Sequence, residues 1–128
     1  MLIMMRKVGW FDIYVNDIDR AQKFYEVVLG TTLVSMDDPN DASVKMRAFE
    51  DDYQSHGAAG ALVQMEHASP GVGGTAVYFT SDDCAVEQGR VEKAGGSIIR
   101  PKFSIGDHGF VSLVSDTEGN MIGFHSQR

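Results

Sequence analysis

The stretch Val8-Gly-Trp-Phe-Asp-Ile-Tyr-Val15, followed by Asn16-Asp17, decides the fold. Aromatic and β-branched residues dominate positions 8–15, which is typical of a β-strand. Asp17 is a residue type that caps the start of a helix, and Gly30 suits a left-handed helix end. Between them, one apolar stripe at helical spacing predicts a helix over residues 20–29, formed by Ala21, Phe24, Tyr25 and Val28.

The same order of elements returns at an offset of 65 residues. Residues 74–80 predict a strand, Ser81-Asp82-Asp83 a helix start, residues 84–94 a helix, and Gly95-Gly96 its end. Aligning Gly9 with Gly74 places Asp17 on Asp82. Three further strands are expected in each half, at 31–36, 44–49 and 61–65 and then at 97–100, 110–115 and 121–125. The chain is therefore predicted to be one domain, residues 1–128, made of two βαβββ modules at residues 8–66 and 74–126.

Composition narrows the classes of function. The chain has 128 residues, which suits a single domain, and its net charge is -7. This acidic balance argues against general binding to nucleic acid or to an anionic membrane surface, and no apolar run approaches the ~20 residues that span a bilayer. One cysteine, Cys84, excludes an internal disulfide. We expect a cytoplasmic protein that contacts neither nucleic acid nor membrane.

Four segments carry a resemblance to a known family. They are Gly9-Trp-Phe-Asp12, Gly74-Thr-Ala-Val-Tyr-Phe79 with Asp82-Asp83, Ala94-Gly-Gly96, and Glu118-Gly-Asn-Met-Ile-Gly123. In this order, within two βαβββ modules, they resemble the vicinal oxygen chelate superfamily, which includes glyoxalase I, extradiol dioxygenases and bleomycin-resistance proteins. The segments are most similar to its glyoxalase-like subgroup. The resemblance implies an α+β fold in which paired, curved mixed sheets surround a cup, and it implies a small-molecule ligand and a homodimer.

The resemblance also locates the metal site of the metal-dependent members. Their ligands lie on the first and last strands of each module, at positions that correspond here to Trp10, Thr75, Gly123 and either Val63 or Gln64. Indole and glycine cannot ligate a metal through a side chain, and threonine is a poor ligand. Only Gln64 could serve, so we expect no metal and no other cofactor, and we expect no metal-dependent glyoxalase I activity.

Strand alternation extends the predicted lining of the cup from these positions. The predicted ligand-binding residues are mostly apolar and aromatic with a few polar groups, as a small-molecule site requires. His108, in a turn, is expected to lean over the mouth of the cup. The set comprises Trp10, Asp12, Tyr14, Gln64, Thr75, Val77, Phe79, His108, Gly123 and His125.

Three functions stay open. The first is a metal-independent protein that binds a small molecule in the manner of bleomycin-resistance proteins. The second is a lyase or isomerase, in which Asp12 and His125 would be the catalytic candidates, as a base with its orienting acid or as half of a non-standard metal site. The third is a regulatory or structural dimer whose cup is filled by its own side chains.

Overall fold

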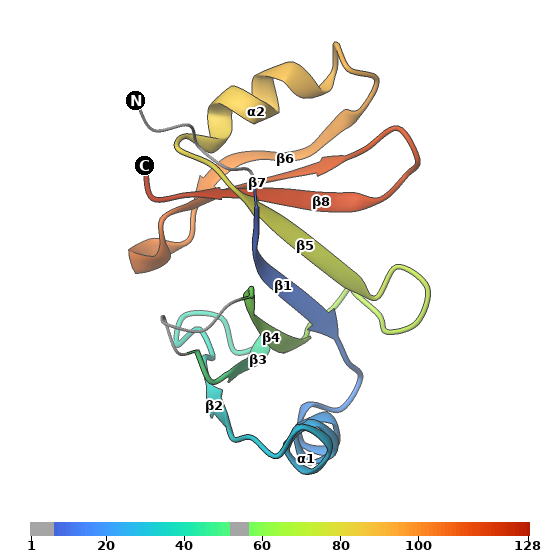
Figure 1. Cartoon of the computed structure of the whole chain (residues 1–128), viewed down its shortest axis with the longest axis vertical. Helices are drawn as coiled ribbons and strands as arrows, with labels where there is room; N and C mark the ends of the chain where they lie inside the picture. Colours follow the sequence, from blue (N-terminus) through green and yellow to red (C-terminus); the bar gives the residue numbers. More distant parts are fainter. Residues whose placement is uncertain (1–6, 52–56) are drawn as a thin grey trace. The chain divides into compact units, whose positions relative to one another are not determined.

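The computed structural model describes residues 7–51 and 57–128. The chain divides into two compact units. Of the described residues, the first unit comprises residues 10–51 and 57–75, and the second unit comprises residues 7–9 and 76–128. The described residues form two α-helices and eight strands in mixed parallel and antiparallel pairing, an α+β architecture as expected (Figure 1). Among the described residues, no helix is both long enough and apolar enough to cross a membrane.

The first unit is a βαβββ module. Its strands pair in the order β2-β3-β4-β1, with β1 parallel to β4 and the other pairs antiparallel. Its elements are β1 (Val8–Tyr14), which belongs to this unit from Trp10 onward, α1 (Ile18–Leu29), β2 (Leu33–Ser35), β3 (Lys45–Phe49) and β4 (Ala59–Gln64).

Local chemistry sets both ends of α1. The Asp17 carboxylate accepts a hydrogen bond from the Arg20 backbone N–H at 3.1 Å, which satisfies one donor of the first turn. Gly30 ends the helix at φ 62°, and its N–H donates to the Glu26 carbonyl. The Asp17 cap and the end at Gly30 are as the sequence predicts, and the helix begins at Ile18, two residues before the predicted start.

The core of the first unit lies between α1 and the sheet. Ile18, Leu33 and Leu62 are buried there, and Ile13 and Val15 pack against them. The Phe11 ring contacts the ring of Phe49, another residue that packs on this core, at 5.7 Å between centroids. Phe11, Ile13 and Val15 therefore lie on the helix side of β1, the side opposite Trp10, Asp12 and Tyr14.

The predicted apolar stripe of α1 is only half right. Ala21 and Tyr25 pack against the core, whereas the side chains of Phe24 and Val28 are exposed. The physical reason is that Ile18 and Tyr25, two turns apart, set the buried face. Phe24 and Val28 then fall on a neighbouring stripe, which is also apolar, and hydrophobic spacing alone does not separate two adjacent apolar stripes.

The second unit repeats the βαβββ order. Its strands pair as β5-β8-β7-β6, with β5 parallel to β8 and the other pairs antiparallel. A short 3-10 turn, η1, lies between β6 and β7. The elements are β5 (Thr75–Thr80), α2 (Cys84–Val91), β6 (Ser97–Ser104), η1 (Gly106–His108), β7 (Phe110–Ser115) and β8 (Met121–Ser126).

The cap of α2 changes the offset between the modules. Asp83, not Asp82, caps this helix, and its carboxylate accepts from the Ala85 backbone N–H at 3.0 Å. Asp17 therefore corresponds to Asp83, an offset of 66 residues from cap to cap (83 - 17) instead of the 65 that the sequence alignment uses. Helix α2 is also shorter than predicted, because it ends at Val91 and residues 92–95 form turns before Gly96.

Helix α2 covers a core that contains polar groups. Cys84 and Ser126 are fully buried, and the Cys84 backbone N–H donates to the Ser126 hydroxyl at 3.0 Å. The Ser81 hydroxyl donates to the buried Glu87 carboxylate at 2.6 Å. Ser112 is fully buried too, and its hydroxyl has no hydrogen-bond partner among the described residues.

Candidate functional site

Each unit has one face of its sheet covered by its own helix, and the candidate site residues lie on the other face. In the first unit this face, here named the β1 face, is built from alternate residues of β1 and β4, because Ile13 and Leu62 between them belong to the helix-side core. It comprises Trp10, Asp12, Tyr14, Ala61 and Val63.

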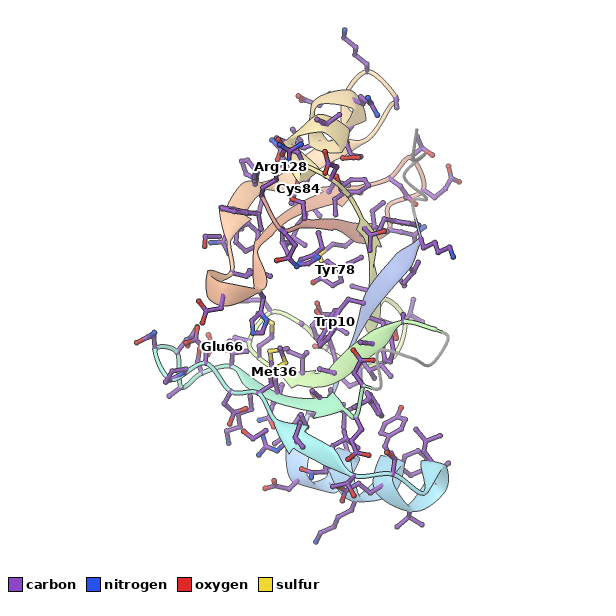
Figure 2. The ribbon with its side chains drawn as sticks, turned by 60° about the vertical axis from the view of Figure 1, so that its left-hand side comes forward. Trp10, Met36, Glu66, Tyr78, Cys84 and Arg128 are labelled. Carbon is purple, nitrogen blue, oxygen red and sulfur yellow. The ribbon has the colours of Figure 1, made fainter. Side chains whose placement is uncertain are left out.

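The β1 face combines an indole and a carboxylate on an apolar floor. The Trp10 indole N–H donates to the Asp12 carboxylate at 2.9 Å. Asp12 is only 8% exposed, and Ala61 and Val63 are buried. Figure 2 shows Trp10 on the side of the strands away from α1. The β1 face therefore presents an aromatic ring and a hydrogen-bond acceptor side by side.

Gln64 does not belong to the β1 face. Its side-chain carbonyl accepts the Ile18 backbone N–H at 2.9 Å, so it satisfies a donor in the first turn of α1. The prediction that Gln64 lines the ligand site would require its side chain to point to the β1 face. The register of β4 against β1 places Ala61 and Val63 on that face instead.

The second unit presents a corresponding surface, here named the β8 face. It comprises Tyr78 and Thr80 of β5 together with Gly123 and His125 of β8, because these residues pair across the parallel ladder. Figure 2 shows Tyr78 on the side of β8 away from α2. A Cβ atom at position 123 would overlap Cδ1 of the Tyr78 ring and lie 2.5 Å from its Cε1. Gly123 is therefore needed for the Tyr78 ring to lie across β8.

Val77 and Phe79 lie on the other side of β5, contrary to the prediction. The Phe79 ring contacts Phe124 at 6.3 Å between centroids, and Phe124 faces a cavity that Val91 of α2 also lines. Thr75, at the exposed start of β5, lies on the same face of the strand as Val77 and Phe79. The one-residue difference in offset explains the error, since a shift of one residue moves every side chain of a strand to the opposite face.

Tyr78 is the residue of this surface that the sequence reasoning missed. The signal lay in Ser81-Asp82-Asp83, where either aspartate could cap the helix. When the alignment of the two modules uses Asp83 as the cap, Tyr78 becomes the equivalent of Asp12. The equivalent of Trp10 then changes from Thr75 to Ala76.

His125 and His108 are brought together at the end of β8. The His125 Nε2 atom lies 2.6 Å from the His108 carbonyl oxygen. A carbonyl only accepts hydrogen bonds, so Nε2 carries the proton and donates, and Nδ1 is the nitrogen that can accept a proton. His108 contributes its backbone to this contact from the exposed η1 turn.

The two catalytic candidates belong to different units. Asp12 lies in the first unit and His125 in the second, and a direct pairing of the two stays a prediction. Among residues 7–51 and 57–128, no group of three or more His, Cys, Asp or Glu side chains could hold a metal ion.

Comparison with known proteins identifies relatives over nearly the whole chain. The sequence model of the Glyoxalase/Bleomycin resistance protein/Dioxygenase superfamily matches residues 7–124. Two mycobacterial proteins, from Mycobacterium bovis and Mycobacterium tuberculosis and each named "Putative glyoxylase CFP32", are 26% identical over 115 residues. The match covers 90% of this chain and 43% of each relative, so the chain spans less than half the length of these relatives.

Solved structures show the same fold at low sequence identity. Methylmalonyl-CoA epimerase of Streptomyces coelicolor, in complex with 2-nitronate-propionyl-CoA, matches with a TM-score of 0.67 at 14% identity, over 96% of this chain and 95% of that chain. The Mycobacterium tuberculosis methylmalonyl-CoA epimerase matches with a TM-score of 0.69 at 14% identity, over 99% and 93%. A hypothetical protein of Bacillus halodurans matches with a TM-score of 0.73 at 15% identity, over 98% and 96%.

Proposed function

Because the chain belongs to the Glyoxalase/Bleomycin resistance protein/Dioxygenase superfamily, we propose that it binds a small organic molecule without the metal site of the metal-dependent members. The observation that carries the proposal is the Trp10–Asp12 pair on the apolar β1 face. An apolar surface supplies affinity, and a few placed polar groups supply orientation.

The residues at the metal-ligand positions do not fit a metal. With the structural offset these positions are Trp10, Ala76, Gly123 and, on the β1 face, Val63. None of these side chains offers an oxygen, sulfur or imidazole nitrogen to a divalent ion. At Gly123 the space for a ligating side chain is taken by the Tyr78 ring. The proposed function therefore involves no metal-dependent step.

The chemistry of the β1 face favours a flat ligand that carries positive charge. The Trp10 indole can stack on an unsaturated ring or contact a cation. The Asp12 carboxylate beside the indole accepts hydrogen bonds, so it suits a ligand that carries N–H donors or a positive charge. The net charge of -7 acts in the same direction, because it repels polyanions. We therefore propose a cationic aromatic ligand, in contrast to the CoA derivatives bound by the epimerase structures.

A thermal-shift screen tests this proposal with two sets of compounds. One set contains aromatic amines and amidines, and the other contains aromatic carboxylates and phosphates of similar size. We expect members of the first set to raise the melting temperature. We expect Asp12→Asn to weaken binding of the best compound by roughly 10-fold to 100-fold, the range for a lost charged hydrogen bond.

Asp107→Asn is the matched control, since it removes the same charge from the exposed η1 turn. Affinity that is unchanged in Asp12→Asn, or reduced equally in both variants, would contradict the assignment. Gln64→Leu should leave affinity unchanged, because Gln64 is engaged at α1.

A lyase or isomerase is the second candidate, and the His125–His108 contact favours it. The hydrogen bond from Nε2 orients the ring and leaves Nδ1 as a base, which is how a catalytic histidine is prepared for proton abstraction. The test is deuterium incorporation from D2O into small carbon acids, followed by NMR. His125→Gln keeps an amide donor near the position of Nε2 and removes the base. Exchange that survives this substitution would exclude His125 as the base.

A further inference from the structure

Strand β6 carries Arg100 and Phe103 on the side of the sheet away from α2, because the strand has two bulges. The pairing of β6 with β7 shifts by one residue before Arg100 and again before Phe103. Without the first shift, Arg100 would lie opposite Ser112, on the α2 side of the sheet. With it, Arg100 lies opposite Leu113. The second shift places Phe103 on the same side, opposite Val111. Bulges re-aim side chains in this way and are over-represented next to functional sites.

These residues continue the β8 face toward the outer strand of the second unit. In the antiparallel ladder between β7 and β8, Leu113 lies opposite Gly123. In the next row, Val111 lies opposite His125. Opposite residues of a ladder share a face, so the surface runs without a break from β5 to β6. The four added residues are here named the Arg100 shelf: Arg100, Phe103, Val111 and Leu113.

The guanidinium group of Arg100 is restrained and has no acceptor. Its Cζ atom lies 3.6 Å from the centre of the Phe103 ring, in a cation–π contact. Arg100 is exposed, and no hydrogen bond or ion pair joins it to the residues that the structure describes. The neighbouring Lys102 differs, because its Nζ atom lies 2.9 Å from the Asp83 carboxylate. The N–H donors of Arg100 are therefore available to a ligand.

The rest of the shelf and the adjoining β8 face supply a floor without acidic groups. Val111 is buried and Leu113 is half-buried. In the row that begins at Arg100, the next side chain beyond Leu113 is the Tyr78 ring, which lies across β8. An anion at Arg100 therefore meets no opposing charge from this surface. Neighbouring strands are about 4.8 Å apart, so the Cα atoms of Arg100 and Gly123 are about 10 Å apart, which suits one ring with a carboxylate.

We propose that the Arg100 shelf binds a small aromatic monocarboxylate. The carboxylate accepts two parallel hydrogen bonds from the Arg100 guanidinium, the geometry that arginine favours. The ring of the ligand lies on Leu113 and against Tyr78. One arginine matches the single charge of a carboxylate, whereas the net charge of -7 disfavours polyanions. This site goes beyond the cationic ligand proposed for the β1 face and is independent of it, because the shelf belongs to the second unit and Asp12 to the first.

NMR titration of the full chain with benzoate tests the proposal, and benzamide is the matched neutral ligand. We expect benzoate to shift the Nε–H resonance of Arg100 and the amide resonances of β6 and β7, with a dissociation constant on the order of 1 mM. Benzamide should bind at least about 10-fold more weakly, because it has no charge to pair with the guanidinium.

Two variants assign the binding to the shelf. Arg100→Gln should weaken benzoate binding at least about 10-fold, because the charged hydrogen bonds are lost. Arg90→Gln is the matched control, since Arg90 is an exposed arginine in the last turn of α2, on the other side of the sheet. Phe103→Leu should weaken binding by about 2-fold to 5-fold, because the charge stays but the ring that restrains it is gone.

Three results would overturn the proposal. The first is a spectrum that does not change at about 20 mM benzoate, roughly 20 times the expected constant. The second is equal affinity for benzoate and benzamide. The third is benzoate affinity that survives Arg100→Gln or falls equally in Arg90→Gln. None of them bears on the amine compounds at the β1 face, which are tested through Asp12.

Discussion

The contact between Gly123 and Tyr78 leads to the sharpest prediction, because it depends on the register that the structure assigns to β5. In Gly123→Ala the new methyl group would overlap the Tyr78 ring, so the ring must move off β8. Overpacking of this kind lowers the free energy of unfolding by about 1–3 kcal/mol, whereas replacing a glycine in a strand by alanine raises it by about 0.5–1 kcal/mol. We expect a net loss of about 1–2 kcal/mol in the free energy of unfolding.

Urea denaturation followed by circular dichroism measures this loss. Gly89→Ala is the matched control, since Gly89 lies inside α2 and, in the described part of the chain, no atom apart from the adjacent backbone lies within 4 Å of its Cβ position. That substitution should stabilise the protein by about 0.5–1 kcal/mol, the ordinary gain of alanine over glycine in a helix. The two glycine-to-alanine changes should therefore have opposite signs.

A double-mutant cycle with Tyr78→Ala shows whether the ring is the cause. Once the ring is gone, Gly123→Ala should cost nothing, which gives a coupling energy of about 1–2 kcal/mol between the two positions. If Gly123→Ala is neutral in the wild type, or equally costly with and without the Tyr78 ring, then Tyr78 does not lie across Gly123. The assignment of residues to the β8 face would then be wrong.

Four other outcomes are expected. Ser112→Ala should leave the protein as stable or stabilise it by up to about 1 kcal/mol in urea denaturation, because the buried hydroxyl has no partner among the described residues; a clear loss would show that the hydroxyl is bonded. Asp17→Ala should lower stability by about 1 kcal/mol, and Asp17→Ser should restore most of it, because a serine also caps α1. Gln64→Leu should cost about 1 kcal/mol by leaving the Ile18 N–H without its acceptor, and equal stability would place Gln64 elsewhere. Hydrogen bonds from the side chain and backbone of Asn120 hold the pKa of the Asp116 carboxyl below its usual range. The ionised carboxyl therefore stabilises the folded protein above about pH 4, and this stabilisation is lost as the pH falls through the lowered pKa. The stability difference between wild type and Asp116→Asn should shrink in acid, and a constant difference would contradict this origin.

The elements of the fold could be predicted because their signals are local. A run of aromatic and β-branched residues predicts β1, and a capping aspartate with a terminal glycine predicts the ends of α1. Strand β7 has the predicted bounds, and β8 is one residue longer than expected. Strand β6 extends four residues beyond its predicted end, through Pro101, because the bulged pairing with β7 accommodates that residue.

Which side chains of each strand or helix face the core is harder to predict, because it depends on partners that are distant in sequence. Both Asp82 and Asp83 can cap a helix, and only the packing of α2 shows that Asp83 does so. That single residue decides whether Tyr78 or Phe79 shares a face with Gly123. On α1, Phe24 and Tyr25 are both aromatic, and contact with Phe49 places Tyr25 against the core.

The sequence by itself determined the repeated βαβββ order, the family, and the placement of Trp10, Asp12 and Tyr14 on one face of β1. The order of elements and the placement of these side chains follow from residue types at short spacings, and the family follows from the resemblance of four segments. Only the tertiary structure decided that Gln64 serves α1, that Tyr78 lies across Gly123, and that Phe24 is left uncovered. The physical reason is that a strand exposes its two faces with a period of two, so an uncertainty of one residue in register exchanges them completely.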